Sequence, residues 1–414
     1  MKSDFSNLLN RIAASQDDII RWQCEMTACE AIAPESGGEG EARKIALIEK
    51  WLRDLGISSL WRIDAPDPRV PTGIRPSLLA LYPGNSARTL WLFAHADVVP
   101  AGDLAAWQSD PWKVKRSGDL LYGRGVEDNQ QAIASMLALL SAIVKENYLP
   151  NQSLGLVFMA DEENGSKYGL EYILDQKGEL FSEECLYVVP DAGSANAEVM
   201  EVAEKGQLWL KFTICGQQCH ASTPHKGRNA LVASAALILA IERQLSLLFP
   251  EKNQLFRPPA STFVPTRHDA NNVAINIVPG TDIFYLDCRL LPEISLNDVV
   301  QRAREIAQGI AREYGVGAEV DIIHAQEPSS ISLDCASVQV LKKAVKNVYG
   351  TLPRPVGIGG ATVAYFLRRR NLPAVVWACL NNTCHQPNEN SSIRATIGDA
   401  MVFAHMLEDS IAGS

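Results

Sequence analysis

Seven side chains that can bind metal or carry protons follow apolar segments or glycine-rich turns along the sequence. They are His95, Asp97, Asp128, Glu162, Glu163, Asp191 and His385, within LFAHAD, GRGVED, FMADEENG, VVPDAG and CHQPNE. Each motif alone has an ordinary explanation, such as a core histidine, a helix cap, a turn or a solvated acidic loop. Together, two histidines and several carboxylates are the ligand set that proteins use for a pair of zinc ions.

The residue types also suggest a division of roles within such a site. His95 can offer a neutral imidazole nitrogen to one metal. Asp97 lies two residues further, so on an extended chain it points the same way and can orient that ring. Asp128, after a tight G-R-G turn, can lie between two metals. Glu162 and Glu163 are adjacent and face different directions, so one can bind metal while the other holds a proton.

Four apolar segments are predicted to be buried strands: TLWLFAH, SLGLVFM, CLYVVPD and AVVWACL. Helical patterns alternate with them: IALIEKWLRDLG, AIASMLALLSAIVKENYL, KYGLEYILDQKG and SVQVLKKAVKNVYG. This alternation predicts a mainly parallel sheet with helices on both faces. Sites in such sheets lie at the carboxyl ends of the strands, where the acids and histidines fall.

The pattern changes near residue 206. The segment has a strand at QLWLKFTIC and a helix at NALVASAALILAIERQLSLL. Two strands follow around a P-G turn in AINIVPGTDIFYLDCRLLP, then the helix DVVQRAREIAQGIAREYG and the strand GAEVDIIHAQ. This order predicts a ferredoxin-like α+β insert. We therefore expect a catalytic domain, residues 1–205 and 326–414, interrupted by a second domain at 206–325.

Composition narrows the partners. The 414 residues carry a formal net charge of −10, and 47% are hydrophobic, as in a globular protein. Nucleic acid and anionic membranes are not expected partners, because both need clustered basic residues. The one basic cluster, Arg368–Arg370, is expected to end a solvated helix.

The sequence also predicts where the protein works. The first 18 residues include acidic side chains and no long apolar stretch, so no signal peptide is expected. No apolar segment of about 18 residues is apparent, so no membrane span is expected. The nine cysteines show no framework spacing, and neither Cys-His pair has C-x-x-C-H spacing. These features favour a reducing cytoplasm.

The motifs resemble, over nearly the whole chain, the zinc metallohydrolases that include acetylornithine deacetylase, succinyl-diaminopimelate desuccinylase, aminoacylase-1 and bacterial glutamate carboxypeptidase. The resemblance implies a zinc-exopeptidase-like catalytic domain with a lid and dimerisation domain. It implies these roles: His95 and Asp191 on one zinc, Glu163 and His385 on the other, Asp128 bridging, Asp97 orienting His95, and Glu162 as general base. It also implies a cis peptide between Asp128 and Asn129.

Further motifs of the resemblance concern the substrate. GQQCHASTPHKGRNA matches the family's histidine motif, so His220 is expected to enter the partner subunit's site and polarise the scissile carbonyl. The alternative is that His220 caps a loop of its own subunit. The motif NIVPG implies a substrate contact by Asn276. The motifs DCRLLP and GIGGATVA imply contacts with a substrate carboxylate by Arg289, Gly360, Ala361 and Thr362. The sequence departs from the family where Asn129–Gln131 replaces its usual lysine and Val363 replaces an aspartate.

The resemblance implies a cytoplasmic homodimer with two zinc ions per chain, replaceable by cobalt or manganese. The expected reaction is hydrolysis of the amide bond of N-acyl amino acids or small peptides with a free carboxylate. One alternative is a dipeptidase, tripeptidase or carboxypeptidase of the same family. The other is a catalytically inactive binding protein, against which the complete ligand set and Glu162 argue.

Overall fold

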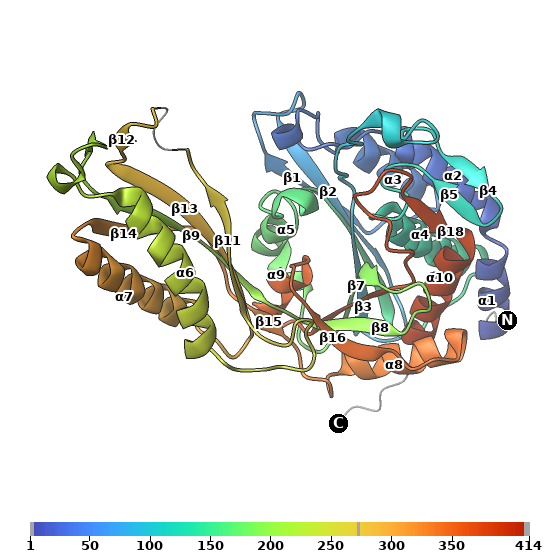
Figure 1. Ribbon diagram of the computed structural model, residues 1–414. Coiled ribbons are helices and arrows are strands. Elements are labelled where there is room, and N and C mark those ends of the chain that lie inside the picture. The colour runs from blue at the N-terminus through green and yellow to red at the C-terminus, as the bar shows by residue number, and fades with distance from the viewer. Residues whose placement is uncertain (1–3, 271–273, 410–414) are drawn as a thin grey trace. The chain divides into compact units, whose positions relative to one another are not determined.

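The computed structural model describes residues 4–270 and 274–409, whose contacts divide the chain into two units (Figure 1). The first unit comprises Met1–Val202, Ile331–Pro355 and Thr362–Ser414. The second comprises Ala203–Ser330 and Val356–Ala361. The short segment 356–361, which the sequence analysis assigns to the catalytic domain, thus groups with the second unit.

The large sheet contains four parallel strands in the order β6 (Ser153–Met159), β3 (Thr89–His95), β7 (Leu186–Gly193) and β17 (Ala374–Ala378). These are the four strands that the sequence predicts for a parallel sheet. The flanking strands β1 (Leu60–Pro66), β2 (Ile74–Tyr82) and β8 (Val199–Glu204) are antiparallel to their neighbours, so the sheet is mixed. Sequence periodicity identifies the parallel centre because those strands are buried on both faces and uniformly apolar.

Helices cover both faces of this sheet, as Figure 1 shows. α5 (Leu170–Lys177) and α9 (Ala364–Arg368) share a core with Trp91, Phe93 and Tyr187. The opposite face is covered by helices that pack on one another and on β3, β7 and β17. They are α4 (Gln130–Lys145), α8 (Ala336–Tyr349) and α10 (Ile393–Glu408), flanked by α1 (Phe5–Ala13) and α2 (Gln16–Thr27). α3 (Ala42–Asp54) packs beside β2.

Trp91 fills a space that only a glycine leaves open. Trp91 on β3 is paired in register with Gly155 on β6. A Cβ at position 155 would lie 2.2 Å from the indole ring. The ring also packs against Phe181 at a centroid distance of 4.8 Å. Gly155 is therefore required by packing at this point of the sheet.

The second unit is a four-stranded antiparallel sheet, ordered β11 (Thr262–His268), β13 (Thr281–Leu290), β9 (Gly206–Cys215) and β14 (Gly317–Gln326). α6 (Ala230–Leu248) and α7 (Leu296–Tyr314) lie side by side against it (Figure 1). This β-α-β-β-α-β connectivity and strand order confirm the ferredoxin-like insert.

One predicted strand of the insert was wrong. The segment 274–278 contributes only β12 (Ile277–Val278), which pairs with β10 (Cys219–His220) in a separate two-stranded ladder. The second strand of the four-stranded sheet is instead β11, which contains Pro265 and an irregular register beside it. An edge strand tolerates proline because its outer N–H positions need no partner, so the proline masked this strand in the sequence.

β9 is an inner strand of this sheet. β13 and β14 pair with β9 on its two sides along its whole length. The alternating burial of β9 follows from its place in the centre of a one-sided sheet, where inward side chains meet α6 and α7. Among the described residues, β11 and β14 form the edges of this sheet.

Two further predictions need correction: the absence of a long apolar segment and the solvation of Arg368. α6, at 19 residues with a mean hydropathy of 1.7, is long and apolar enough to cross a membrane by length and composition. Its Ala233, Leu237 and Ile241 are buried in the core of the second unit, as in a helix that covers a sheet. Arg368 ends α9 as predicted, but it is buried rather than solvated, and its Nη1 lies 2.9 Å from a carboxylate oxygen of Glu201.

We predict that Gly155→Ala lowers the thermal unfolding midpoint of the metal-free protein, followed by circular dichroism. The added methyl group must displace Trp91, and overpacking of this kind costs about 1–3 kcal/mol. The matched control is Gly309→Ala in α7, because an added methyl group there would have no neighbouring atom within 4 Å. There alanine favours the helix by about 0.5–1 kcal/mol, so the midpoint should not fall. A midpoint unchanged by Gly155→Ala would contradict this packing argument.

Candidate metal centre

The predicted metal ligands come together in the first unit, at the carboxyl ends of the parallel strands. His95 is the last residue of β3, and Asp191 lies near the end of β7. Asp128 precedes α4, and His385 follows β17 on a loop. Glu163 lies in a short 3-10 helix, Glu162–Asn164, that follows β6. Strand direction therefore collects ligands that are up to 290 positions apart in the sequence (385 − 95 = 290).

Asp128 lies between the two histidines. Its Oδ1 is 2.8 Å from Nε2 of His95, and its Oδ2 is 3.1 Å from Nε2 of His385. Each oxygen of one carboxylate therefore faces a different imidazole, which is the arrangement that a bridging carboxylate needs. Nε2 of His95 also lies 3.5 Å from Asp191, and Nε2 of His385 lies 3.1 Å from Glu163.

The donor atoms form two overlapping groups with spacings suited to metal ions. One group consists of His95, Glu162 and Asp191, and the other of His95, Asp128 and Glu163. Within each group the ligand atoms lie within 4.8 Å of one another. Imidazole nitrogen and carboxylate oxygen are donors that zinc and related divalent ions accept. The chemistry of this donor set fits a metal centre of the kind that the sequence predicts.

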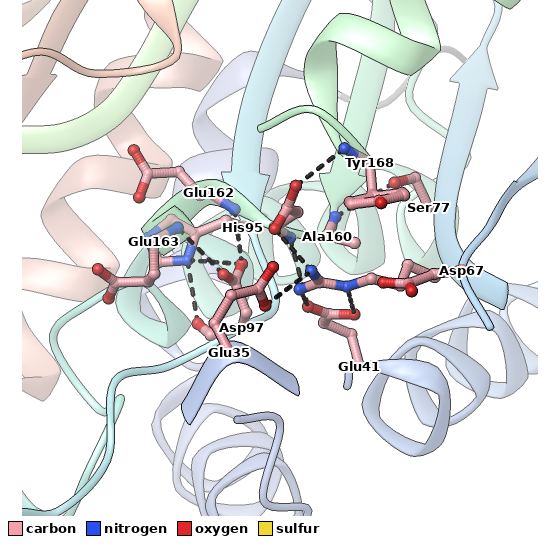
Figure 2. Close-up of polar contacts among 12 residues, drawn as sticks. Glu35, Glu41, Asp67, Ser77, His95, Asp97, Ala160, Glu162, Glu163 and Tyr168 are labelled. Atoms are coloured by element: carbon pink, nitrogen blue, oxygen red, sulfur yellow. Dashed lines mark hydrogen bonds and ion pairs between the residues drawn. The ribbon is translucent and has the colours of Figure 1, made fainter. Parts of the chain in front are cut away.

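Asp97 connects His95 to the turn that carries the two glutamates. Nδ1 of His95 lies 3.0 Å from the backbone carbonyl of Asp97 and 3.4 Å from its carboxylate. The Asp97 carboxylate accepts the backbone N–H groups of Glu162 and Glu163, each at 3.1 Å. Figure 2 shows both glutamates extending away from Asp97. Asp97 thus orients the imidazole mainly through its carbonyl, while its side chain holds the glutamate turn.

A buried ion-pair network stabilises the same turn (Figure 2). Arg75, on β2, pairs with Glu41, and its Nη1 lies 2.6 Å from the Asp161 carboxylate. Asp161 has a left-handed backbone, with φ of 63°, directly before Glu162. Its side chain also accepts the N–H of Tyr168 at 2.8 Å. These contacts stabilise a conformation that is unfavourable for a non-glycine residue.

The turn before Asp128 has special backbone geometry. Gly125 has φ of 85°, and a Cβ there would lie 2.6 Å from Val98. The Asp128–Asn129 peptide is cis, as the resemblance implies. The Asn129 side chain donates to the Asp191 carboxylate at 2.5 Å and to the Pro190 carbonyl at 3.0 Å. Asn129 therefore helps to position Asp191, one of the predicted ligands.

Electrostatics distinguish the groups of this cluster. Burial and the neighbouring Asp191 carboxylate hold the pKa of Glu162 well above its ordinary value. Hydrogen bonds with Asp128 and Glu163 raise the pKa of His385 to about 10. Burial alone would lower the pKa of His95, but contacts with the surrounding aspartates raise it well above the usual value. In the metal-free protein both imidazoles therefore favour their protonated forms, so this acidic site attracts positive charge.

The predicted substrate residues lie mostly in the second unit. On β10, Nδ1 of the exposed His220 accepts the N–H of Ser222 at 3.1 Å. The backbone carbonyl of Asn276 accepts the N–H of Ala221 at 2.9 Å, so the histidine and asparagine motifs are neighbours. Arg289, on β13, donates from Nη1 to the Gly359 carbonyl at 3.1 Å, and its Nε lies 2.8 Å from Asp287.

Gly360 and Ala361 belong to the same unit as Arg289, so the structure places the glycine turn near the predicted arginine. Thr362 begins the next segment of the first unit. Its hydroxyl oxygen accepts the N–H of Ala364 at 3.1 Å, a contact typical of a helix start. The roles of these residues in substrate binding stay predictions.

Sequence reasoning missed two buried glutamates beside the ligands, Glu127 and Glu389. Glu389 accepts N–H groups from the Asp128 turn, and Glu127 accepts N–H groups from the His385 loop. The available signal was proximity, because Glu127 lies within GRGVED and Glu389 within CHQPNE. Their function depends on contacts between segments about 255 residues apart, which periodicity does not reveal.

The chain is similar in sequence to a known protein family and to individual proteins. Residues 91–409 match the model of peptidase family M20/M25/M40. An uncharacterized metallohydrolase of Methanococcus maripaludis is 33% identical over 410 residues, covering 95% of this chain and 99% of that protein. A succinyl-diaminopimelate desuccinylase of Cereibacter sphaeroides is 28% identical over 407 residues, covering 95% and 98%, respectively.

The fold is shared with solved structures as well. The aminopeptidase PepT of Bacillus cereus superposes with a TM-score of 0.75 at 19% identity, over 95% of this chain and 98% of that one. The family match spans more than half of the sequence and includes all the predicted metal ligands. The chain therefore belongs to peptidase family M20/M25/M40 and is a metal-dependent hydrolase.

Proposed function

We propose that this hydrolase cleaves the amide bond of N-acyl amino acids or small peptides that carry a free carboxylate. The observation that carries the proposal is the Asp128 carboxylate, which offers one oxygen toward His95 and the other toward His385. Glu162 lies in the same cluster with a raised pKa caused by burial and by Asp191. A shared carboxylate and a proton carrier are the parts that metal-assisted amide hydrolysis requires.

The proposed cofactor is a pair of zinc ions, with cobalt or manganese as substitutes. His95 and Asp191 would hold one ion, Glu163 and His385 the other, and Asp128 both. When bound, such ions polarise a carbonyl group and lower the pKa of a water molecule. Two positions are supported because Asp128 makes separate contacts with two histidines that lie on different segments.

The protein residues would then move the protons. Glu162 takes a proton from the attacking water and delivers it to the leaving amine, which needs a pKa near the working pH. Its raised pKa suits that exchange. Nδ1 of His220 accepts the Ser222 N–H, which leaves Nε2 as the ring nitrogen that can donate. An Nε2–H donor suits a developing carbonyl oxyanion.

The substrate carboxylate is assigned to Arg289 and the glycine turn at Gly360–Thr362, with Asn276 as a further polar contact. A guanidinium group binds carboxylates in a two-pronged geometry. The proposal favours a deacylase, in line with the similarity to a desuccinylase over 95% of the chain. A small-peptide peptidase is the second candidate, favoured by the fold shared with an aminopeptidase. An inactive binding protein is the third, distinguished by a lack of turnover.

We also propose a homodimer in which His220 serves the partner's site. Strand pairing through β9 cannot form the dimer contact, since β13 and β14 already pair with this strand. Support comes from α6, where Leu239 is 73% exposed and Leu247 is 69% exposed. Apolar side chains gathered on one helix are typical of a surface that another chain covers.

The first prediction is turnover of one substrate class by zinc- or cobalt-loaded protein. The panel contains N-acetyl and N-succinyl amino acids, dipeptides, tripeptides and matched carboxamides. The carboxamides should show kcat/KM lowered about 10- to 100-fold, because a charge-assisted contact is lost. Absence of turnover across the panel would contradict this assignment of the substrate class.

Two glutamate variants control that experiment. Glu162→Gln should lower kcat by about 10²–10⁴ while metal content stays unchanged, because only the proton acceptor is removed. Glu163→Gln should instead lower metal content, measured by elemental analysis after dialysis. Near-normal kcat in Glu162→Gln would mean that another group carries the proton.

The second prediction concerns pH. Metal-free His385 is protonated at neutral pH, because its neighbours raise its pKa to about 10. Metal binding at His385 must displace this proton, so affinity for that ion should rise about tenfold per pH unit between about pH 6.5 and 8.5. Chelator competition measures it, and the control His385→Gln should remove this share of the pH dependence while leaving the share of His95, whose pKa is also raised. A pH-independent affinity of the unmutated protein would show that His385 is already neutral.

The third prediction concerns the shared site. His220→Ala and Glu162→Gln are each expected to be inactive. Mixed dimers contain one site with both residues intact, so mixing the two proteins should restore part of the activity. Subunit exchange is verified by differently tagged chains. If exchange occurs and activity does not return, each chain supplies its own histidine.

A further inference from the structure

Two buried glutamates outside the metal ligand set connect the loops that carry Asp128 and His385. Glu127 is 1% exposed and directly precedes Asp128. Glu389 is fully buried and follows His385 by four residues. Each carboxylate reaches from its own loop to backbone groups of the other loop.

Glu389 binds the turn that carries Asp128. Its Oε1 accepts the N–H groups of Glu127 at 2.9 Å and of Asp128 at 3.0 Å. Its Oε2 accepts the N–H of Gly125 at 3.0 Å and Nη1 of Arg124 at 2.6 Å. The turn therefore wraps around one carboxylate, and the place of Asp128 depends on the loop that follows His385.

Glu127 acts in the opposite direction. Its Oε1 accepts the N–H of Asn382 at 2.9 Å. Its Oε2 accepts both the N–H of Thr383 at 2.5 Å and the Thr383 hydroxyl at 2.7 Å. The His385 side chain is 53% exposed, and its backbone is left-handed with φ of 61°. Burial does not fix this histidine, so the loop depends on anchors such as Glu127.

Glu127 and Glu389 are expected to affect one metal position more than the other. Asp191 is held by Asn129, and His95 is held by Asp97, so that side of the centre has its own supports. The distance between Asp128 and His385, by contrast, depends on how their two loops sit against each other.

We propose that Glu127 and Glu389 are positioning residues that set His385 against Asp128. They thereby determine the metal affinity of the position formed by Asp128, Glu163 and His385. The proposal rests on the proposed function for the presence of two metal positions. It assigns a role to residues that contact neither metal nor substrate.

The test uses Glu127→Gln in the full-length protein. The amide keeps the size of the side chain, but its nitrogen cannot accept an N–H or hydroxyl group. Glu389→Gln is the reciprocal variant, though it leaves buried Arg124 without its ion pair and can impair folding. Metal-free protein is titrated calorimetrically with zinc and with cobalt.

The expected result is that one metal equivalent, the one that Glu163→Gln also weakens, binds about 10- to 100-fold more weakly, as for other groups that orient metal ligands. The other equivalent should change less than about threefold, since its supports are intact. Glu163→Gln provides the reference for damage to the same position. Equal weakening of both equivalents in Glu127→Gln, or of neither, would overturn the proposal.

Asp119→Asn is the matched control. Asp119 accepts the Ser392 hydroxyl at 2.5 Å and the Arg394 N–H at 3.1 Å, so it joins β5 (Leu120–Tyr122) to the segment after β18 (Asn390–Ser392). Like Glu127, Asp119 is a carboxylate that connects the same two regions of the chain. Unlike Glu127, it does not contact the loops that carry Asp128 and His385. This variant should reduce thermal stability while leaving both metal equivalents unchanged.

A second readout needs no metal. In metal-free protein, hydrogen exchange of the peptide covering residues 380–389 should accelerate in Glu127→Gln and stay unchanged in Asp119→Asn. Unchanged exchange in Glu127→Gln would contradict the anchoring role. If the unmutated protein binds no metal, the proposed function fails, while this exchange measurement still decides whether Glu127 holds the loop.

Discussion

The carboxylate of Asp128 is the contact on which the candidate site depends, because each of its oxygens faces a different histidine. One histidine ends a buried strand, and the other lies on an exposed loop. Bringing these donors to one acid requires the parallel strands to end at a common edge of the sheet and the loops to be held in place. The fold supplies the first condition, and hydrogen bonds to the backbone supply the second.

Gathering acids in this way is costly unless their charges are compensated. The protein places cations and N–H groups behind the site: Arg75 pairs with Glu41 and Asp161, and Arg124 pairs with Glu389. Lys44 is also buried, and burial lowers its pKa to about 8 against the opposing pull of nearby acids. The face toward the ligands keeps an excess of negative charge, which suits a divalent cation.

The second unit has a different architecture. Its antiparallel sheet has one face covered by α6 and α7, and it carries His220, Asn276 and Arg289 on strands or adjacent turns. Residues 356–361 belong to it by contact although they lie between segments of the first unit. Groups proposed for substrate recognition are thereby separated in the chain from groups proposed for metal binding and proton transfer.

Much of the candidate site could be predicted from the sequence, because the ligands follow apolar runs whose strand character is locally determined. The four central strands and the ferredoxin-like order of the insert were predicted correctly for this reason. β11 was missed because Pro265 disguised an edge strand, and the flanking antiparallel strands carried no distinct pattern.

What the sequence determined was the set of chemical groups and the strands that deliver them. Only the tertiary structure decided which atoms meet: the two oxygens of Asp128 on two histidines, Asn129 on Asp191, and the carboxylates of Glu127 and Glu389 on each other's loops. It also showed Arg368 to be a buried partner of Glu201 rather than a solvated charge. Local patterns report secondary structure and burial, whereas these contacts join segments whose separation in sequence carries no periodic signal.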